Sequence, residues 1–326
     1  MAFRGRGGRF TVAACGWGLV GLMVMLVPSV VGGSTRAVCA AMGHGCGIVV
    51  RTPAGRCLVY DAGRLGAATA AGRSISAVLQ TEGVWAIDCL VLSHADTDHF
   101  NGVPALLRRF RVRQVVVPAA FLASRSATAR GLLEQLRRQR VPVRTAAAGD
   151  SIAIDTQCVA RVLHPAADLP IDGVSDNERS LVLAVEAAGR RLLLTGDLEG
   201  ESLSRFIAAG PPTCDVLVAP HHGSDGAGLG RLIDATCADA VVVSGHGGDE
   251  LQRLVGSDSD ARCKPTLVVR TAGPTQDNRG AVATVLSERG VEISQFVEGR
   301  WQRRQRSHSP TITNCRPRLV PPKYAG

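Results

Sequence analysis

Short apolar runs separated by turn-forming residues dominate the sequence between residues 43 and 297. The runs are too short for buried helices and have the length of β-strands. Two of them, residues 46–50 and 56–60, flank Thr52-Pro53-Ala54-Gly55, a tetrapeptide that is typical of a turn. This first part of the pattern therefore predicts a β-hairpin.

The rest of the pattern predicts helices alternating with strands, followed by several consecutive strands. We expect helices at residues 74–82, 104–110, 127–140, 198–207 and 229–237. The expected strands cover residues 89–92, 114–117, 141–145, 151–154, 158–163, 181–186, 191–195, 215–219, 240–243, 266–270, 281–286 and 291–297. This order is typical of an α/β protein with mixed sheets rather than one fully parallel sheet.

The densest group of polar side chains follows the apolar run 89–92, in the stretch Ser93-His94-Ala95-Asp96-Thr97-Asp98-His99. Two imidazoles and two carboxylates at the end of a buried strand suit zinc or a harder divalent ion such as manganese. The alternative is a polar loop that caps the next helix, with Asn101 near the cap and Pro104 in the first turn. Such a dense group of potential ligands favours the metal site.

Further potential ligands follow other expected strands. Asp61 and Asp197 each come directly after an apolar run, and Pro220-His221-His222-Gly223-Ser224 follows the run 215–219. Taken singly, each has a simpler interpretation as a turn residue, a helix cap or a polar loop. Together they predict one convergent site at the edge of a sheet, with Asp61 placed to support it. The remaining candidates between expected strands are His164, Asp176 and Asn177.

The formal net charge of +9 is concentrated at the two ends of the chain. Residues 1–32 hold three arginines and no acid, and residues 300–326 hold six arginines, one lysine and no acid. The central part is therefore close to neutral, so the overall charge gives no argument for nucleic-acid binding. The local exception is residues 108–144, with ten arginines and the single acid Glu134. That segment is either a solvated helix face or a surface for a polyanion.

Residues 12–31 contain no charge and follow a basic segment. Their length fits a single membrane span, and their order also fits an uncleaved signal anchor or a signal peptide. The rest of the chain would then lie on the outer face of the cytoplasmic membrane or be exported. The alternative is a glycine-rich tail that does not insert. We predict an anchor at residues 1–33, a folded domain at 40–299 and a basic, disordered tail at 300–326.

The order of these motifs resembles the metallo-β-lactamase fold superfamily. Within it, VLSHADTDHFNG, VLHP, SDNERSLVL, RRLLLTGDLEG and VLVAPHHGS are similar to the C-terminal hydrolase domain of the ComEC family of DNA-uptake competence proteins. The resemblance runs from about residue 43 to residue 224, and more loosely to residue 297. It implies an αββα sandwich with two divalent metal ions, zinc or manganese, between its sheets.

The resemblance also implies roles for individual residues. His94 and Asp96 would bind one ion, and Asp98, His99 and His221 would bind the other. Asp197 would bridge the two ions, and either Asp98 or Asp197 would orient the catalytic water. The superfamily's usual third-motif histidine is missing before Ser180, so Asp176 and His164 are alternative donors for the first ion. Residues expected to support the ligands or to contact substrate are Asp61, Ser93, Asn177, His222 and Ser224.

Three features depart from the family's pattern. The superfamily's usual second histidine is Asp96 here, as in the ComEC branch. Gly43-His44-Gly45-Cys46 stands where many relatives carry Gly-x-Gly-Asp. A ComEC protein has a channel of many membrane spans, whereas at most one span is expected here. A separate channel-forming partner protein is one way to reconcile this difference.

Three functions are compatible with the sequence. The first is a metal-dependent phosphodiesterase, a nuclease acting on DNA in a competence role, in which a metal-bridging hydroxide attacks phosphorus. The second is a metallo-hydrolase of small esters, lactams or thioesters, because one fold supports many reactions. The third is a non-catalytic, membrane-attached binding module whose first metal site has decayed.

Overall fold

The computed structural model describes residues 33–66, 68–170, 172–224, 226–247, 263, 265–272 and 280–307. Residues 1–32 of the predicted anchor lie outside these ranges, as does the predicted tail beyond residue 307. None of the helices within the described ranges combines the length and the apolar character needed to cross a membrane.

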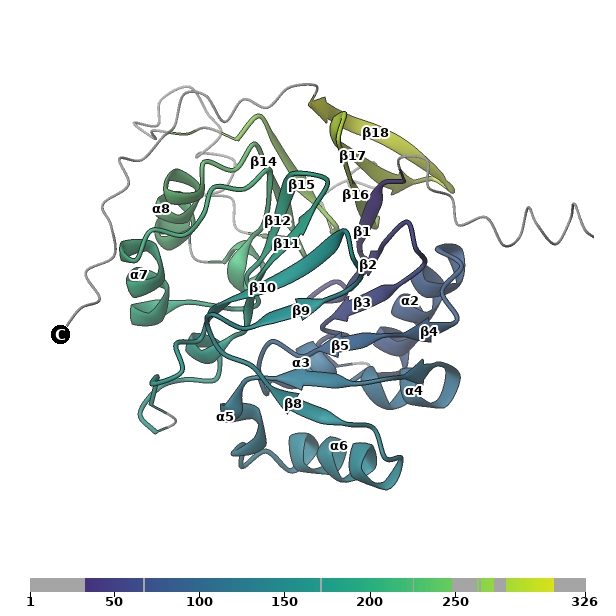
Figure 1. Cartoon of the computed structure of the whole chain (residues 1–326), viewed down its shortest axis with the longest axis vertical. Helices are drawn as coiled ribbons and strands as arrows, with labels where there is room; N and C mark the ends of the chain where they lie inside the picture. Colours follow the sequence, from purple (N-terminus) through teal and green to yellow (C-terminus); the bar gives the residue numbers. More distant parts are fainter. Residues whose placement is uncertain are drawn as a thin grey trace, which may run out of the picture. The chain divides into compact units, whose positions relative to one another are not determined.

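Nine strands of the described chain form the first sheet, in the order β18-β17-β16-β1-β2-β3-β5-β7-β8 (Figure 1). Neighbours from β18 to β3 pair antiparallel, whereas β3, β5, β7 and β8 run parallel. Their bounds are β1 (Thr35–Cys39), β2 (Ile48–Arg51), β3 (Cys57–Tyr60), β5 (Cys89–Val91), β7 (Val115–Val117), β8 (Val143–Thr145), β16 (Val282–Ser287), β17 (Gly290–Val297) and β18 (Arg300–Ser307).

Seven described strands form the second sheet, in the order β15-β14-β13-β12-β11-β10-β9. Strands β12 to β15 run parallel, and β9 to β12 pair antiparallel. Their bounds are β9 (Ser151–Ala153), β10 (Cys158–His164), β11 (Val182–Ala187), β12 (Arg190–Leu194), β13 (Val216–Val218), β14 (Ala240–Val243) and β15 (Leu267–Arg270). A small separate sheet pairs β4 (Ala86–Ile87) with β6 (Arg111–Val112).

The helices lie on the outer faces of the two large sheets. Those associated with the first sheet are α2 (Ala68–Thr81), α3 (Thr97–Phe100), α4 (Val103–Arg109), α5 (Ala119–Leu122) and α6 (Ala127–Arg138). Those associated with the second sheet are α7 (Gly200–Ala208) and α8 (Gly226–Thr236). Two 3₁₀ turns, η1 (Asn177–Arg179) and η2 (Pro220–Gly223), follow or precede strands of the second sheet.

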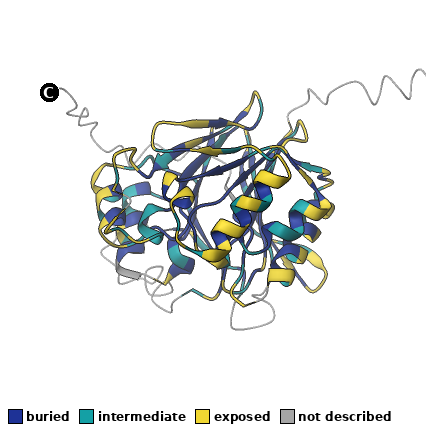
Figure 2. Ribbon diagram, turned by 90° about the horizontal axis from the view of Figure 1, so that it is seen from below, coloured by how far each residue is buried: buried dark blue, intermediate teal, exposed yellow. Residues whose placement is uncertain are grey.

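Three buried apolar clusters define four layers. The first joins the two sheets and includes Leu58 of β3 and Leu183 of β11. The second lies between the first sheet and its helices, and the third lies between the second sheet and α7 with α8. Helices therefore bury one side and expose the other, as Figure 2 shows. The predicted αββα sandwich is confirmed.

Alternation along the central strands explains why both faces of each sheet are covered. In β2, Ile48 and Val50 point into the core between the sheets, and Val49 points toward the helices. A strand has a side-chain period of two, so a strand buried on both faces is apolar at every position. This explains why the sequence showed continuous apolar runs rather than an alternating pattern.

Two predicted domain boundaries are wrong. Residues 35–39 form β1, which lies inside the first sheet between β2 and β16, so the folded domain begins before residue 40. Residues 300–307, assigned to a disordered tail, form the edge strand β18. The arginines there suggested disorder, but Trp301 packs against Phe296, and the guanidinium of Arg36 lies 4.8 Å from the centre of the Trp301 ring.

Candidate metal centre

The candidate ligands lie where strands of both sheets end. Asp61 follows β3, the stretch 93–99 follows β5, Asp197 follows β12, and His222 follows β13. Strands β3 and β5 are parallel neighbours, and so are β12 and β13, so the carboxyl ends of each pair lie side by side. The carboxyl ends of the two pairs face one another, and the site lies between them.

Asp61 fixes the stretch 93–99. Its carboxylate is fully buried and accepts hydrogen bonds from the backbone N–H and the hydroxyl of Ser93, both at 2.7 Å. It also lies 2.8 Å from Nδ1 of His99, so this nitrogen carries the hydrogen. Asp61 therefore supports the stretch 93–99 from behind.

His99 lies between two carboxylates. Its Nδ1 is bound by Asp61, and its Nε2 lies 3.2 Å from Oδ1 of Asp197. Burial alone lowers the pKa of His99, but the negative charges of Asp197 and Asp61 outweigh burial and raise the pKa well above its usual value. In the metal-free protein at neutral pH, His99 is therefore an imidazolium.

His94, like His99, is held through Nδ1, which leaves Nε2 to face the site. Its Nδ1 lies 2.9 Å from the hydroxyl of Ser93 and 3.3 Å from the hydroxyl of Ser180. Its Nε2 lies 3.6 Å from Oδ2 of Asp96, whose side chain is half exposed. The Ser180 hydroxyl also accepts a hydrogen bond from the backbone N–H of Asp197, so it links the two sheets at the site.

His222, rather than His221, belongs to the cluster, which corrects the sequence prediction. Nδ1 of His222 donates to the carbonyl of Ser244, and Nε2 lies 3.5 Å from Oδ2 of Asp197 and 3.8 Å from Oδ2 of Asp98. His221 is turned away and pairs with Glu199, at 2.6 Å. Both histidines have positive φ, a backbone conformation that neighbouring-residue patterns in a sequence do not reveal.

The positive charges around the site keep its carboxylates ionised. Burial by itself raises the pKa of Asp197, but nearby His99 and His222 lower it well below its usual range. Burial also opposes ionisation of Asp98, yet the proximity of His222 and the charge of His99 lower its pKa to about 2. Both groups are therefore available as anionic ligands at neutral pH.

Three buried ring nitrogens point into the space between these carboxylates. Within the described chain, Nε2 of His94, of His99 and of His222 makes no hydrogen bond, although each is buried. Leaving such nitrogens without a partner is unfavourable, and in each ring Nδ1 is already held by a hydroxyl, a carboxylate or a carbonyl. This arrangement is typical of histidines that bind metal through Nε2.

Distances and charge also fit divalent ions. The separations between Nε2 atoms and carboxylate oxygens in the cluster range from 3.2 to 3.8 Å for the pairs described above. Ligand atoms around a tetrahedral zinc ion are roughly 3.3 Å apart, given bonds of about 2.0–2.1 Å. The four carboxylates of the site, those of Asp61, Asp96, Asp98 and Asp197, carry a formal charge that two divalent ions would balance.

Several other predicted residues lie outside the cluster. Nε2 of His164 donates a hydrogen bond to the backbone carbonyl of Glu178, and the ring packs near Phe206. Asp176 pairs with Arg179, and the amide of Asn177 donates to Glu199. Neither His164 nor Asp176 supplies the missing donor, because the segment before Ser180 turns its polar side chains toward α7 and its own backbone.

Ser224 takes a structural position instead. Its hydroxyl donates to the carbonyl of His221 at 2.6 Å, and both residues line a surface pocket with Glu199. The expected contact of Ser224 with substrate stays a prediction.

Two contributors to the cluster are not predicted from the sequence. The first is Ser180, whose hydroxyl lies against His94 and Asp197. His44, in the β1–β2 loop, has its Nε2 3.6 Å from Oδ2 of Asp98. Burial, reinforced by the charge of His222, lowers the pKa of His44, so it is a neutral imidazole at neutral pH. Its position beside a glycine-rich turn was the available signal.

The fold and this cluster are typical of hydrolases of the metallo-β-lactamase superfamily. Residues 46–246 match the sequence model of the metallo-beta-lactamase superfamily, which is more than half of the chain. The chain belongs to this superfamily, whose members typically bind divalent metal ions.

Two curated relatives confirm the resemblance to competence proteins. "ComE operon protein 3" of Bacillus subtilis (strain 168) is 33% identical over 168 residues, which cover 51% of this chain and 21% of the relative. "Competence protein ComA" of Neisseria gonorrhoeae is 28% identical over 257 residues, which cover 78% of this chain and 33% of the relative. The chain therefore spans about a fifth to a third of the length of these relatives.

Solved structures with a similar backbone have low sequence identity. The CmlA beta-hydroxylase E377D mutant has a TM-score of 0.46 and 14% identity, covering 77% of this chain and 54% of its own. Zn(2+)-bound PqqB from Methylobacterium extorquens has a TM-score of 0.39 and 14% identity, covering 58% of this chain and 71% of its own.

Replacing Asp61 with asparagine should weaken both the fold and metal binding. An amide cannot accept all three hydrogen bonds, so a buried donor of Ser93 or His99 loses its partner. We expect a loss of about 1–3 kcal/mol in the free energy of unfolding and a roughly 10–100-fold weaker metal affinity. Denaturant unfolding and metal titration measure the two effects. Asp168→Asn, at an exposed aspartate, is the control; equal behaviour of the two variants would contradict this role.

Metal binding should release protons at neutral pH. Because His99 is protonated in the metal-free protein, an ion that binds its Nε2 displaces a proton, and metal affinity should rise with pH. Calorimetric titration with Zn²⁺ in buffers of different ionisation enthalpy measures the number released. Asp61→Asn removes one of the two charges that hold the proton on His99, so it should release fewer. A heat of binding that does not depend on the buffer would contradict the prediction.

Proposed function

We propose that this domain is a metal-dependent phosphodiesterase that cleaves DNA. The observation that carries the proposal is the convergence of three unbonded Nε2 atoms, those of His94, His99 and His222, on the carboxylates of Asp98 and Asp197. Such a group of donors serves hydrolysis by metal-activated water more readily than it serves a purely structural ion, because half-exposed Asp96 leaves one side of the site open.

The residues divide into two ligand sets that share Asp197. His94 and Asp96 form one set, and Asp98 with His222 forms the other, while His99 lies against both Asp197 and Asp98. Two divalent ions, zinc or manganese, held by these residues would supply Lewis acidity and would lower the pKa of a bound water toward neutral pH.

The chain's own residues orient the reaction. Asp61 and Ser93 hold the rings of His94 and His99, so that Nε2 of each faces the shared carboxylate. Asp98 and Asp197 are ionised and can accept a proton or a hydrogen bond from the attacking water. The buried rings of His99 and His222 exclude bulk solvent from the inner side of the site.

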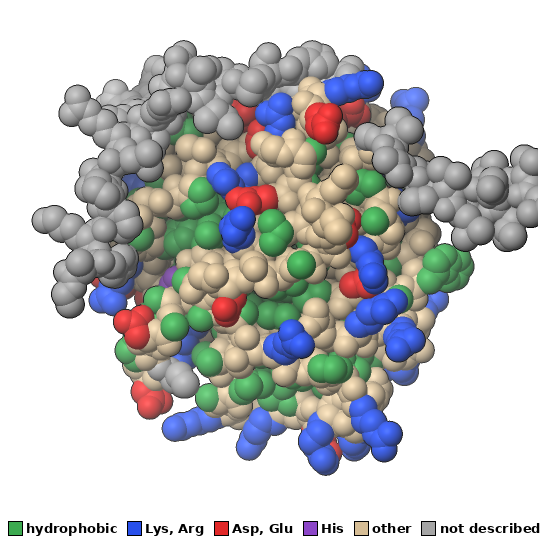
Figure 3. Space-filling model, in the orientation of Figure 1, with side chains coloured by type: hydrophobic (Ala, Val, Ile, Leu, Met, Phe, Trp, Pro, Cys, Tyr) green, Lys and Arg blue, Asp and Glu red, His purple; other side chains and the backbone are tan. Residues whose placement is uncertain are grey.

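Similarity to competence proteins supports DNA as the substrate. The arginine-rich segment 108–144 supports it as well, but most of its arginines lie away from the cluster. The cluster follows the carboxyl end of β5. In contrast, Arg108–Arg113 precede β7 and Arg137–Arg140 precede β8, so they lie at the amino ends of these parallel strands. Figure 3 shows positive side chains gathered along the lower right of the view. These arginines would therefore contact DNA away from the scissile phosphate, and their contribution would be to overall affinity.

One cation lies beside the β1–β2 loop that carries His44. Arg64 follows the Asp61 turn, and its backbone is held by both ends of the Asn101 amide. Its guanidinium lies against Gly43, since a Cβ built there would be 3.3 Å from Nη2. No ion pair with a described residue neutralises it, so Arg64 can bind the phosphate of a substrate.

The charge pattern of the N-terminal segment supports a location for the domain. We propose that residues 12–31 attach it to the membrane, with the hydrolase on the outer face or exported. A separate channel-forming partner would then carry the cleaved strand inward. Both points rest on the charge pattern and on similarity to competence proteins.

DNA cleavage by the purified protein tests the function. Wild-type protein loaded with Mn²⁺ or Zn²⁺ should degrade linear or single-stranded DNA, and chelation should abolish this. Asp98→Ala should lower the rate by more than about 100-fold, because even losses of supporting residues cost 10–100-fold. Asp168→Ala, at an exposed aspartate, is the matched control. A loaded protein that leaves DNA intact but hydrolyses a chromogenic ester or lactam would replace this proposal with small-molecule hydrolysis.

Arg64→Ala should separate phosphate substrates from neutral ones. We expect it to raise KM for DNA or for a small phosphodiester by roughly 10-fold or more, because a hydrogen bond to a charged group contributes about 1.5–3 kcal/mol. Hydrolysis of a neutral ester should not change. Arg64→Lys should recover part of the loss, since it keeps the charge but not the fork-shaped donor pair. Equal effects on charged and neutral substrates would show that Arg64 only supports the fold.

A further inference from the structure

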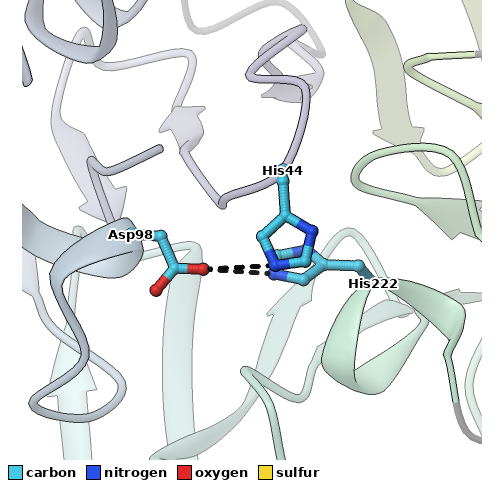
Figure 4. Close-up of side chains that lie close together, drawn as sticks. All are labelled: His44, Asp98 and His222. Atoms are coloured by element: carbon cyan, nitrogen blue, oxygen red, sulfur yellow. Dashed lines mark ion pairs between the residues drawn. The ribbon is translucent and has the colours of Figure 1, made fainter. Parts of the chain in front are cut away.

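The β1–β2 loop brings an additional imidazole to the cluster. Figure 4 shows the rings of His44 and His222 directing nitrogens at one carboxylate oxygen of Asp98. The two Nε2 atoms lie 3.6 and 3.8 Å from this oxygen, respectively. Nε2 of His44, Oδ2 of Asp98 and Nε2 of His222 thus form a compact group of three potential ligands.

His44 is held in place by its own backbone and its neighbours. Its carbonyl accepts a hydrogen bond from the N–H of Leu65 at 2.7 Å, and the next carbonyl, of Gly45, accepts from the Ser244 hydroxyl at 2.6 Å. Gly45 has φ +142, and a Cβ there would lie 2.3 Å from the carbonyl oxygen of Gly63. The loop can approach the cluster this closely only with glycine at that position.

Four imidazoles lie in a row across the site. The centres of successive rings are 4.2 Å apart from His94 to His99, 5.5 Å from His99 to His222, and 4.6 Å from His222 to His44. His44 therefore extends the row of ligands at the end that holds Asp98 and His222. Its side chain is 55% exposed, so it forms the outer wall of the site on this side.

The distance to Asp98 distinguishes two roles for His44. A separation of 3.6 Å is too long for a direct hydrogen bond between the ring and the carboxylate. It is close to the roughly 3.3 Å between two ligand atoms that share one tetrahedral zinc ion, and comparable with the pair of His222 and Asp98.

We propose that His44 is a protein ligand of the ion held by Asp98 and His222. This inference rests on the proposed metal centre but not on DNA as the substrate. It gives that ion more protein ligands than the ion held by His94 and Asp96. Water and substrate would then bind mainly at the ion held by His94 and Asp96, on the side of half-exposed Asp96.

Metal binding by the full chain tests this role without using activity. Co²⁺ is titrated into wild-type protein, His44→Ala and His44→Gln, and binding is followed by visible absorption and by competition with a chelator. We expect both variants to bind one of the two ions roughly 100-fold more weakly or worse, with altered absorption of that ion. The other ion should bind as in the wild type.

His221→Ala is the matched control, because His221 lies next to the cluster and pairs with Glu199 instead. It should keep both ions and the wild-type spectrum. Circular dichroism of each metal-free variant reports on folding, and the glutamine variant serves if the alanine variant does not fold.

The possible results separate the two proposals. Wild-type affinity and spectrum in both His44 variants would overturn the ligand role and leave the centre intact. Retention by His44→Gln alone would also overturn it, because glutamine can replace a hydrogen bond but not an imidazole ligand. Failure of the wild-type protein to bind any ion would overturn the metal centre itself.

Discussion

The buried carboxylate of Asp61 is the interaction on which the site depends. It accepts three hydrogen bonds, two from Ser93 and one from His99, and it is fully excluded from water. A charge in such a place is stable only when every lone pair has a partner. The arrangement therefore fixes the course of the chain after β5 and the ring orientations of His94 and His99 before any ion binds.

The cluster is a compromise between folding and function. Several carboxylates and imidazoles are packed where two sheets meet, and three ring nitrogens of the described chain have no hydrogen bond there. In the metal-free protein the proton on His99 compensates part of the charge of Asp197 and Asp61. A divalent ion compensates it better, because it also satisfies the nitrogens. Metal binding and stability are thus coupled through the same few atoms.

Most of the fold could be predicted from the sequence, because strands buried on both faces produce apolar runs that are hard to mistake. The stretch 93–99 and Asp197 were found for a related reason: each follows such a run directly. The choice between His221 and His222 could not be made, since it depends on two residues with positive φ. The edge strand β18 was not predicted because its arginines are typical of a disordered tail. The packing of Trp301 against Phe296 stabilises it as a strand.

The β1–β2 loop contributes to the site on two sides. Burial raises the pKa of the Cys46 thiol in this loop well above its usual value. A neutral group therefore stands close behind Asp61 and His99, where another carboxylate would add to a crowded set of negative charges. Two residues earlier, the same loop presents the imidazole of His44 to Asp98. The loop thus places a neutral thiol behind the ligands and a neutral imidazole in front of them.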